Sequence, residues 1–240
     1  MFTKIKHLAT IVLTTFLVAC GGGGGGTVTP AVPVDYQLKN AYVNHLTTTG
    51  AQPFTVSGNY TAGGTTYPIT GSGIGTNGAL SSATFEGRSA LGKASTVTGS
   101  ITMNGINAPL NTTSYSYVDS NYNFLGGSGS EYTVVTSQNA IPTIGHVNDT
   151  GNWYTANRYS TSAKTSLIGT RVTSYVIEQD STNTAFLTII TIDKNTSGAT
   201  TSTDGEKYRM TASGALTYIS ATGIVYGTSP VSVMTLTMTF

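Results

Sequence analysis

The last ten residues of the chain, VSVMTLTMTF at positions 231–240, alternate between apolar and small polar side chains. Met234, Leu236, Met238 and Phe240 share one parity, and threonine occupies the positions between them. A repeat of two residues is the periodicity of a β-strand, because successive side chains of a strand point to opposite faces of the sheet. The stretch therefore predicts a strand with one apolar face.

The same periodicity continues back through the chain as far as Asp35. The run FLTIITI at 186–192 is typical of a central strand, and residues 171–178 alternate with Val172 and Val176 on one face. The other predicted strands are residues 36–46, 54–60, 67–74, 80–87, 97–103, 114–118 and 132–136. The predicted turns contain glycine and lie at residues 62–64, 77–78, 104–105, 204–205 and 213–214.

These patterns predict an all-β protein of antiparallel meander sheets, forming a sandwich or small barrels in two tandem units. No window has the pattern of a capped amphipathic helix. The sequence GSGIGTNGAL at 71–80 resembles KYRMTASGAL at 207–216, which suggests an internal repeat. Residues 137–151 interrupt the alternation and contain Pro142. We therefore expect one β domain over 35–140 and a second over 141–240.

The composition excludes several classes of protein. Only 9% of the residues are charged, against roughly 25% in an ordinary soluble domain, and the formal net charge is +1. Such a small net charge indicates no basic surface that could bind the phosphates of nucleic acid, so we expect no nucleic-acid partner. The single cysteine excludes both a disulfide framework and a zinc site built on cysteines.

The first twenty residues have the organisation of a bacterial export signal. Lys4 and Lys6 precede the apolar run at 8–19, which is too short to span a bilayer as a helix. The sequence LVAC, ending at Cys20, resembles the lipobox of bacterial lipoproteins. The resemblance implies a signal peptide over 1–19, cleavage before Cys20 and attachment of acyl chains to that cysteine. Cys20 is therefore the predicted lipidation site, and membrane lipid is the predicted partner.

A flexible tether follows this cysteine. Six glycines at 21–26 precede the stretch TVTPAVPV at 27–34, so residues 20–34 are expected to separate the anchor from the folded body. Glycines directly after the lipidated cysteine resemble those of surface-exposed outer-membrane lipoproteins whose β-barrel domains bind host or environmental proteins. This resemblance implies a lipid-anchored protein of the outer membrane. It leaves open whether the body faces the periplasm or the cell surface.

No pattern in the body predicts a catalytic centre. His45 and His146 are the histidines that follow the leader, and the chain contains no G-x-S-x-G nucleophile motif. Glu178 and Asp180 share one strand face, but a carboxylate pair at this spacing carries no specific signal for glycoside hydrolysis. We therefore expect no catalytic residues, no cofactor and no enzymatic activity.

Two groups of residues remain as weaker candidates for binding. Asp193, Asn195, Ser197 and Asp204 have part of the spacing of an EF-hand calcium loop, although the flanking sequence predicts strands. The group is therefore more simply explained as a long hairpin loop, and no metal site is expected. The aromatic candidates for a ligand-binding surface are Trp153, Tyr154 and Tyr159.

The sequence thus favours a non-catalytic, lipid-anchored protein of the cell envelope that acts as a binding or structural module, with a protein or glycan as its possible ligand. Two alternatives remain open. The apolar alternation ending at Phe240 resembles the C-terminal signature of outer-membrane barrels, which would imply a transmembrane β-barrel. The second alternative is an envelope hydrolase whose site has no recognised motif.

Overall fold

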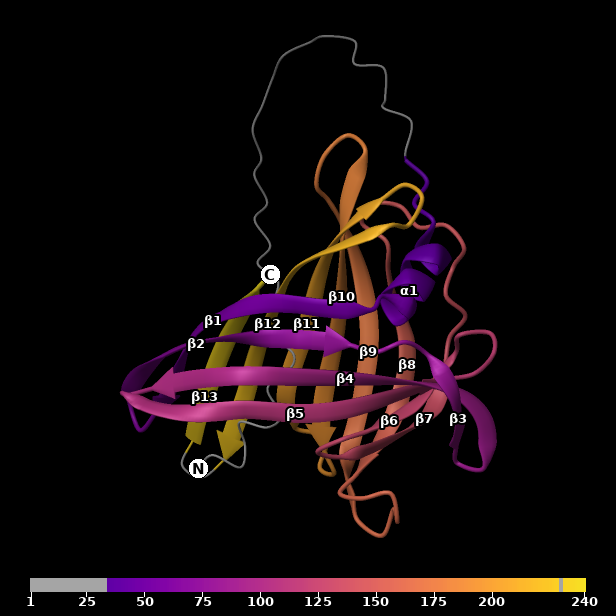
Figure 1. The fold of residues 1–240 in the computed structure, drawn as a ribbon. Helices are drawn as coiled ribbons and strands as arrows, with labels where there is room; N and C mark the ends of the chain where they lie inside the picture. The colour runs from indigo at the N-terminus through magenta and orange to yellow at the C-terminus, as the bar shows by residue number, and fades with distance from the viewer. Residues whose placement is uncertain (1–33, 229–230) are drawn as a thin grey trace, which may run out of the picture.

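The computed structural model describes residues 34–228 and 231–240, which form one short helix and a set of antiparallel strands (Figure 1). The predicted signal peptide, the lipidation site Cys20 and the tether up to residue 33 lie outside the described residues. The elements are α1 (Leu38–Thr47), β1 (Gly50–Ala62), β2 (Thr65–Asn77), β3 (Ser81–Phe85), β4 (Arg88–Met103), β5 (Ile106–Val118), β6 (Phe124–Ser128), β7 (Tyr132–Gln138), β8 (Thr150–Tyr159), β9 (Leu167–Gln179), β10 (Thr184–Asn195), β11 (Thr200–Thr211), β12 (Leu216–Thr228) and β13 (Val231–Thr239).

The strands form a single closed barrel of 12 strands. From β4 to β13 each strand pairs with the next one in the sequence. The first strand, β1, pairs with β13, so that Thr55 lies opposite Thr239, and β2 pairs with β4 to complete the ring. The short strand β3 pairs only with the beginning of β4 and is not part of the ring. Every pairing is antiparallel, which confirms the predicted all-β antiparallel class.

The expectations of a sandwich and of two tandem units are wrong, because the strands close into one ring and both halves of the chain contribute to one sheet and to two shared cores. The α1 core consists of Tyr36, Leu38, Ala41, Tyr42, Leu46, Val118, Trp153, Tyr175, Ile177, Ala185, Leu187, Ile189, Tyr208 and Met210. The β1 core consists of Phe54, Val56, Ile69, Ile101, Met234 and Leu236. The two similar sequences at 71–80 and 207–216 each combine the end of a strand with a turn, which explains their likeness.

Helix α1 occupies the position where the sequence predicts a strand at residues 36–46. Its buried residues are Leu38, Ala41, Tyr42 and Leu46. Their spacings of three, one and four positions place them on one face of a helix, and this face packs against inward side chains of β8 to β11. The ring of Tyr42 contacts that of Trp153 edge to face, with 4.9 Å between centroids. The helix therefore fills one end of the barrel.

A short two-stranded contact holds the chain just before α1. The backbone N–H of Tyr36 donates to the carbonyl of Gly145 at 3.0 Å, and the N–H of Gly145 donates to the carbonyl of Tyr36 at 2.9 Å. Tyr36 is 1% exposed. A Cβ atom at Gly145 would lie 2.6 Å from Cδ1 of Ile177, so a larger residue there would require the Ile177 side chain to move. We call these two hydrogen bonds the Tyr36 clamp.

Three prolines lie within strands, and each is in a stretch that pairs on one side only. Pro53 precedes the part of β1 that pairs with β13. Pro68 precedes the part of β2 that pairs with β4, and Pro109 lies in β5 ahead of its pairing with β6. Proline has no N–H to donate, so it is compatible with a strand only where that donor is not needed.

The seam between β1 and β13 predicts a sensitive position at Gly58. A Cβ atom there would lie 2.1 Å from the carbonyl oxygen of Thr235, so Gly58→Ala forces the two strands apart. We expect the free energy of unfolding to fall by about 1–3 kcal/mol, measured by urea denaturation followed by circular dichroism. Gly75→Ala is the control, since its Cβ atom would have no neighbour closer than 3.9 Å. Equal stability of the two variants would contradict the close packing of this seam.

Candidate binding cavity

A cavity of about 1320 Å³ lies inside the barrel. Its lining includes Leu46 and Trp153 from the α1 core and Phe54 from the β1 core, so it adjoins both clusters. Protein interiors are normally close-packed, and pockets for small molecules usually measure roughly 300–1,000 Å³. The cavity is therefore large enough for a ligand of more than one ring.

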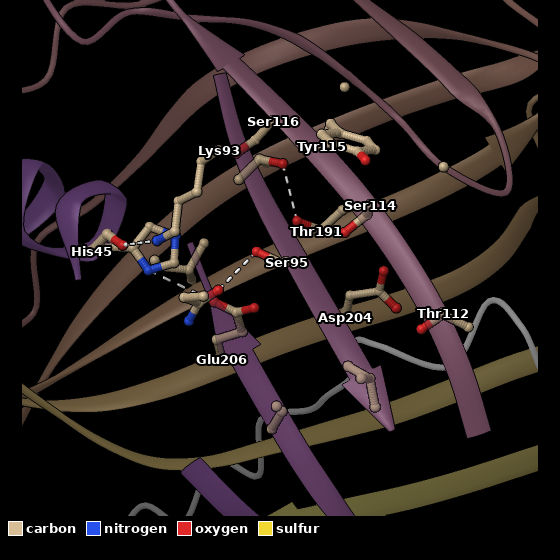
Figure 2. Close-up of a pocket in the computed structure, with 18 of the residues that line it drawn as sticks. His45, Lys93, Ser95, Thr112, Ser114, Tyr115, Ser116, Thr191, Asp204 and Glu206 are labelled. Atoms are coloured by element: carbon tan, nitrogen blue, oxygen red, sulfur yellow. Dashed lines mark hydrogen bonds and ion pairs between the residues drawn. The ribbon is translucent and has the colours of Figure 1, made fainter. Parts of the chain in front are cut away.

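One wall of the cavity carries a row of hydroxyl groups. On the inward parity of β4 and β5, Ser95 lies opposite Ser114, and Thr112 and Ser116 flank Ser114 on β5. Figure 2 shows Asp204 and Glu206, on β11, facing the hydroxyl side chains of β4 and β5. The hydroxyl residues of β4, β5, β9, β10 and β11 that line the cavity are Ser95, Thr96, Thr112, Thr113, Ser114, Ser116, Thr173, Thr191, Thr201 and Ser202.

Four charged side chains form an ion-pair quartet in the lining. Arg158 Nη2 lies 2.7 Å from Glu131 Oε2 and 3.3 Å from Asp193 Oδ2, while Arg171 Nη2 lies 2.7 Å from Glu131 Oε1. Arg171 Nε also lies 2.7 Å from Asp193 Oδ1. Burial alone would lower the pKa of Arg171, but the hydrogen bonds and charge of Asp193, with the charge of Glu131, raise it above its ordinary value. The quartet thus brings two positive and two negative charges together and is neutral.

A hydrogen-bonded chain of three side chains lies beside the end of α1. Tyr208 Oη donates to Glu206 Oε2 at 2.7 Å and lies 3.0 Å from His45 Nδ1. The Tyr208 hydroxyl has a single proton, which it donates in the hydrogen bond to Glu206. Towards His45 the hydroxyl oxygen is therefore the acceptor, and His45 Nδ1–H is the donor. Burial lowers the pKa of His45, and the charge of Glu206 opposes this shift only in part. The imidazole is therefore neutral at neutral pH.

Lys93 closes the C-terminal end of α1. Its Nζ donates to the carbonyl oxygens of Leu46 at 3.0 Å and of His45 at 3.4 Å. Carbonyls in the last turn of a helix lack partners within the helix and carry the negative end of its dipole, so an ammonium group is favourable there. Burial lowers the pKa of Lys93 below its ordinary value, and the charge of Glu206 opposes this shift only in part. This lysine couples the helix to β4.

The structure brings two of the three aromatic candidates to the cavity. Trp153 and Tyr154 both line it, and the ring of Tyr154 packs against Phe124 at 4.6 Å between centroids. Trp153 is 3% exposed. Among the described residues, its Nε1 is the one buried side-chain nitrogen or oxygen atom that has no hydrogen-bond partner. Tyr159 lies at the end of β8 outside this lining, where its hydroxyl accepts a hydrogen bond from Asn157.

The calcium-loop candidates do not converge on one point. Asp193 belongs to the ion-pair quartet, whereas Asn195 and Ser197 lie at the turn between β10 and β11. The Asn195 side-chain oxygen accepts hydrogen bonds from the N–H groups of Ser197 and Ala199, both at 3.0 Å, and so stabilises the turn. Asp204 lies within β11 and faces the cavity, so the turn predicted at residues 204–205 is wrong. Within the described residues, no group of three or more potential metal ligands is placed to hold an ion.

The two histidines that the sequence analysis considered lie in different environments. His45 contacts Tyr208, as described above, and within the described residues it forms no hydrogen bond to a serine hydroxyl. His146 lies on the exterior, with Nε2 2.9 Å from Asp35 Oδ1 and Nδ1 3.6 Å from Asp149 Oδ2. These contacts join the start of the folded body to the β7–β8 connection.

Lys93 and Arg171, two charged residues of the cavity, were not predicted from the sequence, whereas Asp193 and Asp204 were named only as calcium-loop candidates. The alternation of residues along β9 could have indicated Arg171 as an interior residue. Arg171 shares the parity of the buried residue Ile177, while Val172 has the opposite parity and faces outward. A charged residue in phase with buried neighbours indicates an interior polar site.

Comparison with known proteins identifies no relative. No family model, no curated protein and no solved structure matches the chain. Within residues 34–228 and 231–240, no helix has the length and apolarity needed to cross a bilayer. The function is therefore inferred from the cavity and from the leader sequence.

The ion-pair quartet predicts that Arg158→Met is strongly destabilising, because it leaves the carboxylates of Glu131 and Asp193 with only one arginine. We expect a loss of about 3–5 kcal/mol in the free energy of unfolding, measured by urea denaturation. The control is Lys207→Met, which removes an exposed ion pair with 3.4 Å between Lys207 Nζ and Glu178 Oε2 and should cost less than about 1 kcal/mol. Similar losses in both variants would show that the quartet is not the buried network described.

Proposed function

We propose that this protein is a lipid-anchored, non-catalytic binding protein of the bacterial envelope that holds a small ligand inside its barrel. The observation that carries the proposal is the cavity of about 1320 Å³ with its polar and charged lining. Desolvating charged groups is costly, and a barrel selected only for stability would fill this volume with apolar side chains. A ligand site gives a physical reason for keeping both the space and the polar groups.

The leader supports the anchoring part of the proposal. The lipobox-like sequence LVAC ends at Cys20, and 14 residues, 20–33, precede the first described residue, Val34. Val34 packs against the α1 core, so the tether joins the barrel at the end that α1 fills. Several acyl chains on one cysteine provide a lasting anchor, since each buried CH₂ contributes about 0.8 kcal/mol.

The outer wall over β1, β2, β4 and β13 supports a barrel in water over the alternative of a transmembrane barrel, whereas the outward parity of β9 and β10 includes Val172, Val176, Phe186, Ile190 and Ile192. A membrane barrel needs a band of apolar side chains on its outward face. On β1, β2, β4 and β13 the outward parity instead consists mainly of uncharged polar residues that are exposed or half-buried. They include Thr55, Ser57, Asn59, Thr70, Ser72, Thr98, Ser100, Thr102, Thr235, Thr237 and Thr239.

Replacing the lipidation site tests the anchor. We expect wild-type protein to partition into the detergent phase of fractionated cells and Cys20→Ala to be recovered in the aqueous phase, because the variant has no acyl chains to hold it in the membrane. Cys20→Ala that remained in the membrane and resisted extraction with carbonate would instead support the transmembrane alternative. The measurement is quantitative immunoblotting of the two phases.

Blocking the cavity tests the binding function. Ser114→Phe projects a ring into the space in front of Asp204, whereas Thr98→Phe places the same ring on the outward face of β4. We expect native mass spectrometry of the full lipidated protein, incubated with small molecules extracted from the envelope, to show a bound molecule on wild type and Thr98→Phe but not on Ser114→Phe. Absence of a bound molecule from all three proteins would contradict the proposed function.

A further inference from the structure

The charges around the cavity already have partners, which limits the charge of a ligand. Two arginines and two carboxylates neutralise one another in the ion-pair quartet. Lys93 is held by the carbonyls at the end of α1, Glu206 accepts a hydrogen bond from Tyr208, and Asp204 is a buried carboxylate of the same lining. A ligand with a strong charge of either sign would have to compete with these contacts or be buried beside a like charge. The lining therefore favours an uncharged ligand.

The uncharged polar groups of the lining are mostly hydroxyls, which both donate and accept hydrogen bonds. Thr173 and Thr191 contact each other at 3.0 Å between their hydroxyl oxygens, and Ser95 donates to Asn77 Oδ1 at 2.7 Å. Carboxylates and guanidinium groups also line the cavity, so its wall contains both acceptors and donors. A ligand that carries many hydroxyl groups can satisfy such a mixed surface, because each of its hydroxyls also acts as donor and acceptor.

Aromatic side chains supply the apolar part of the lining. Tyr218 stacks between Tyr208 and Phe240, with centroid distances of 4.7 and 4.2 Å, and all three rings line the cavity. Tyr154 and Trp153 lie elsewhere in the lining. The Trp153 Nε1–H is a buried donor without an acceptor in the protein, and its indole packs between Tyr42 and Tyr175. Flat aromatic surfaces beside hydroxyls match the C–H faces and hydroxyl edges of a sugar ring.

From this lining we infer that the cavity binds an uncharged, polyhydroxylated ligand, a short neutral oligosaccharide. The inference rests on the proposed function and specifies its ligand class. The volume of about 1320 Å³ exceeds that of a usual small-molecule pocket, roughly 300–1,000 Å³, and so leaves room for several linked sugar rings. Charge neutrality of the ligand predicts an affinity that does not depend on salt concentration.

Calorimetric titration of the full lipidated protein tests this inference. The protein is held in a zwitterionic detergent without a sugar head group. The neutral probes are maltotriose, cellotriose, mannotriose and chitotriose, and the charged probes are spermidine and citrate. We expect at least one neutral trisaccharide to bind saturably, with the same dissociation constant at low and high salt. Binding should weaken at least tenfold in Ser114→Phe and be unchanged in the outward control Thr98→Phe.

A second variant covers the case in which a bulky substitution disturbs folding. Thr112→Val removes a hydroxyl that lines the cavity while nearly conserving the side-chain volume, and we expect up to about tenfold weaker sugar binding, as for the loss of one hydrogen bond. Circular dichroism establishes that each variant is folded.

The possible outcomes separate the ligand class from the proposed function. Binding of spermidine or citrate without binding of any trisaccharide would overturn the ligand class and leave the proposed function standing. Trisaccharide binding that is equally strong in Ser114→Phe would place the sugar outside the cavity and also overturn the inference. If no probe binds and wild-type protein retains no envelope molecule in native mass spectrometry, both proposals fail.

Discussion

The antiparallel pairing of β1 with β13 is the contact on which the rest of the molecule depends. It joins the first strand of the chain to the last and, together with the pairing of β2 with β4, turns an open sheet into a ring. In a closed ring every strand has one inward and one outward face. The β1 core draws Phe54 from β1 and Leu236 from β13, so this core exists only when the seam is closed. The cavity needs the same closure, because its lining includes Phe54 and Met238.

The interior enclosed by this ring changes from apolar to polar. Side chains around α1 form one apolar cluster and those around β1 form another, while the lining of the cavity contains charged residues and hydroxyls. The interior charges are tolerable because the quartet pairs them and because Lys93 compensates the carbonyls of a helix end. Polar positions on both faces of the wall help to explain why a chain so rich in threonine still folds as a barrel, since threonine keeps a high strand propensity on either face.

The local features of this fold could be predicted from the sequence, and the long-range ones could not. The alternation at 231–240 corresponds to β13, and the glycine turns at 62–64, 104–105 and 213–214 lie between strands as predicted. The turn predicted at 204–205 failed because a glycine next to an aspartate also occurs inside a strand that passes a cavity.

The other failures have equally specific causes. Helix α1 was missed because Leu38, Ala41 and Leu46 also fit an irregular strand, and only their contacts within the barrel select the helix. A periodicity of two also does not say which strands pair, so the seam between β1 and β13 and the single barrel could not be deduced. For the same reason the residues of the cavity, which come from many strands, could not be grouped. Trp153 and Tyr154, which line it, had been proposed only as aromatic candidates for a binding surface.

The Tyr36 clamp has a mechanical consequence for a barrel held by its N-terminal end. A pulling force on the chain ahead of Val34 reaches the paired backbone of Tyr36 and Gly145 before it reaches α1. Those two hydrogen bonds, with the fully buried Tyr36 ring, bear the load and pass it to the β7–β8 connection. Such a force would load the connection between two wall strands before it loads the helix at the end of the barrel.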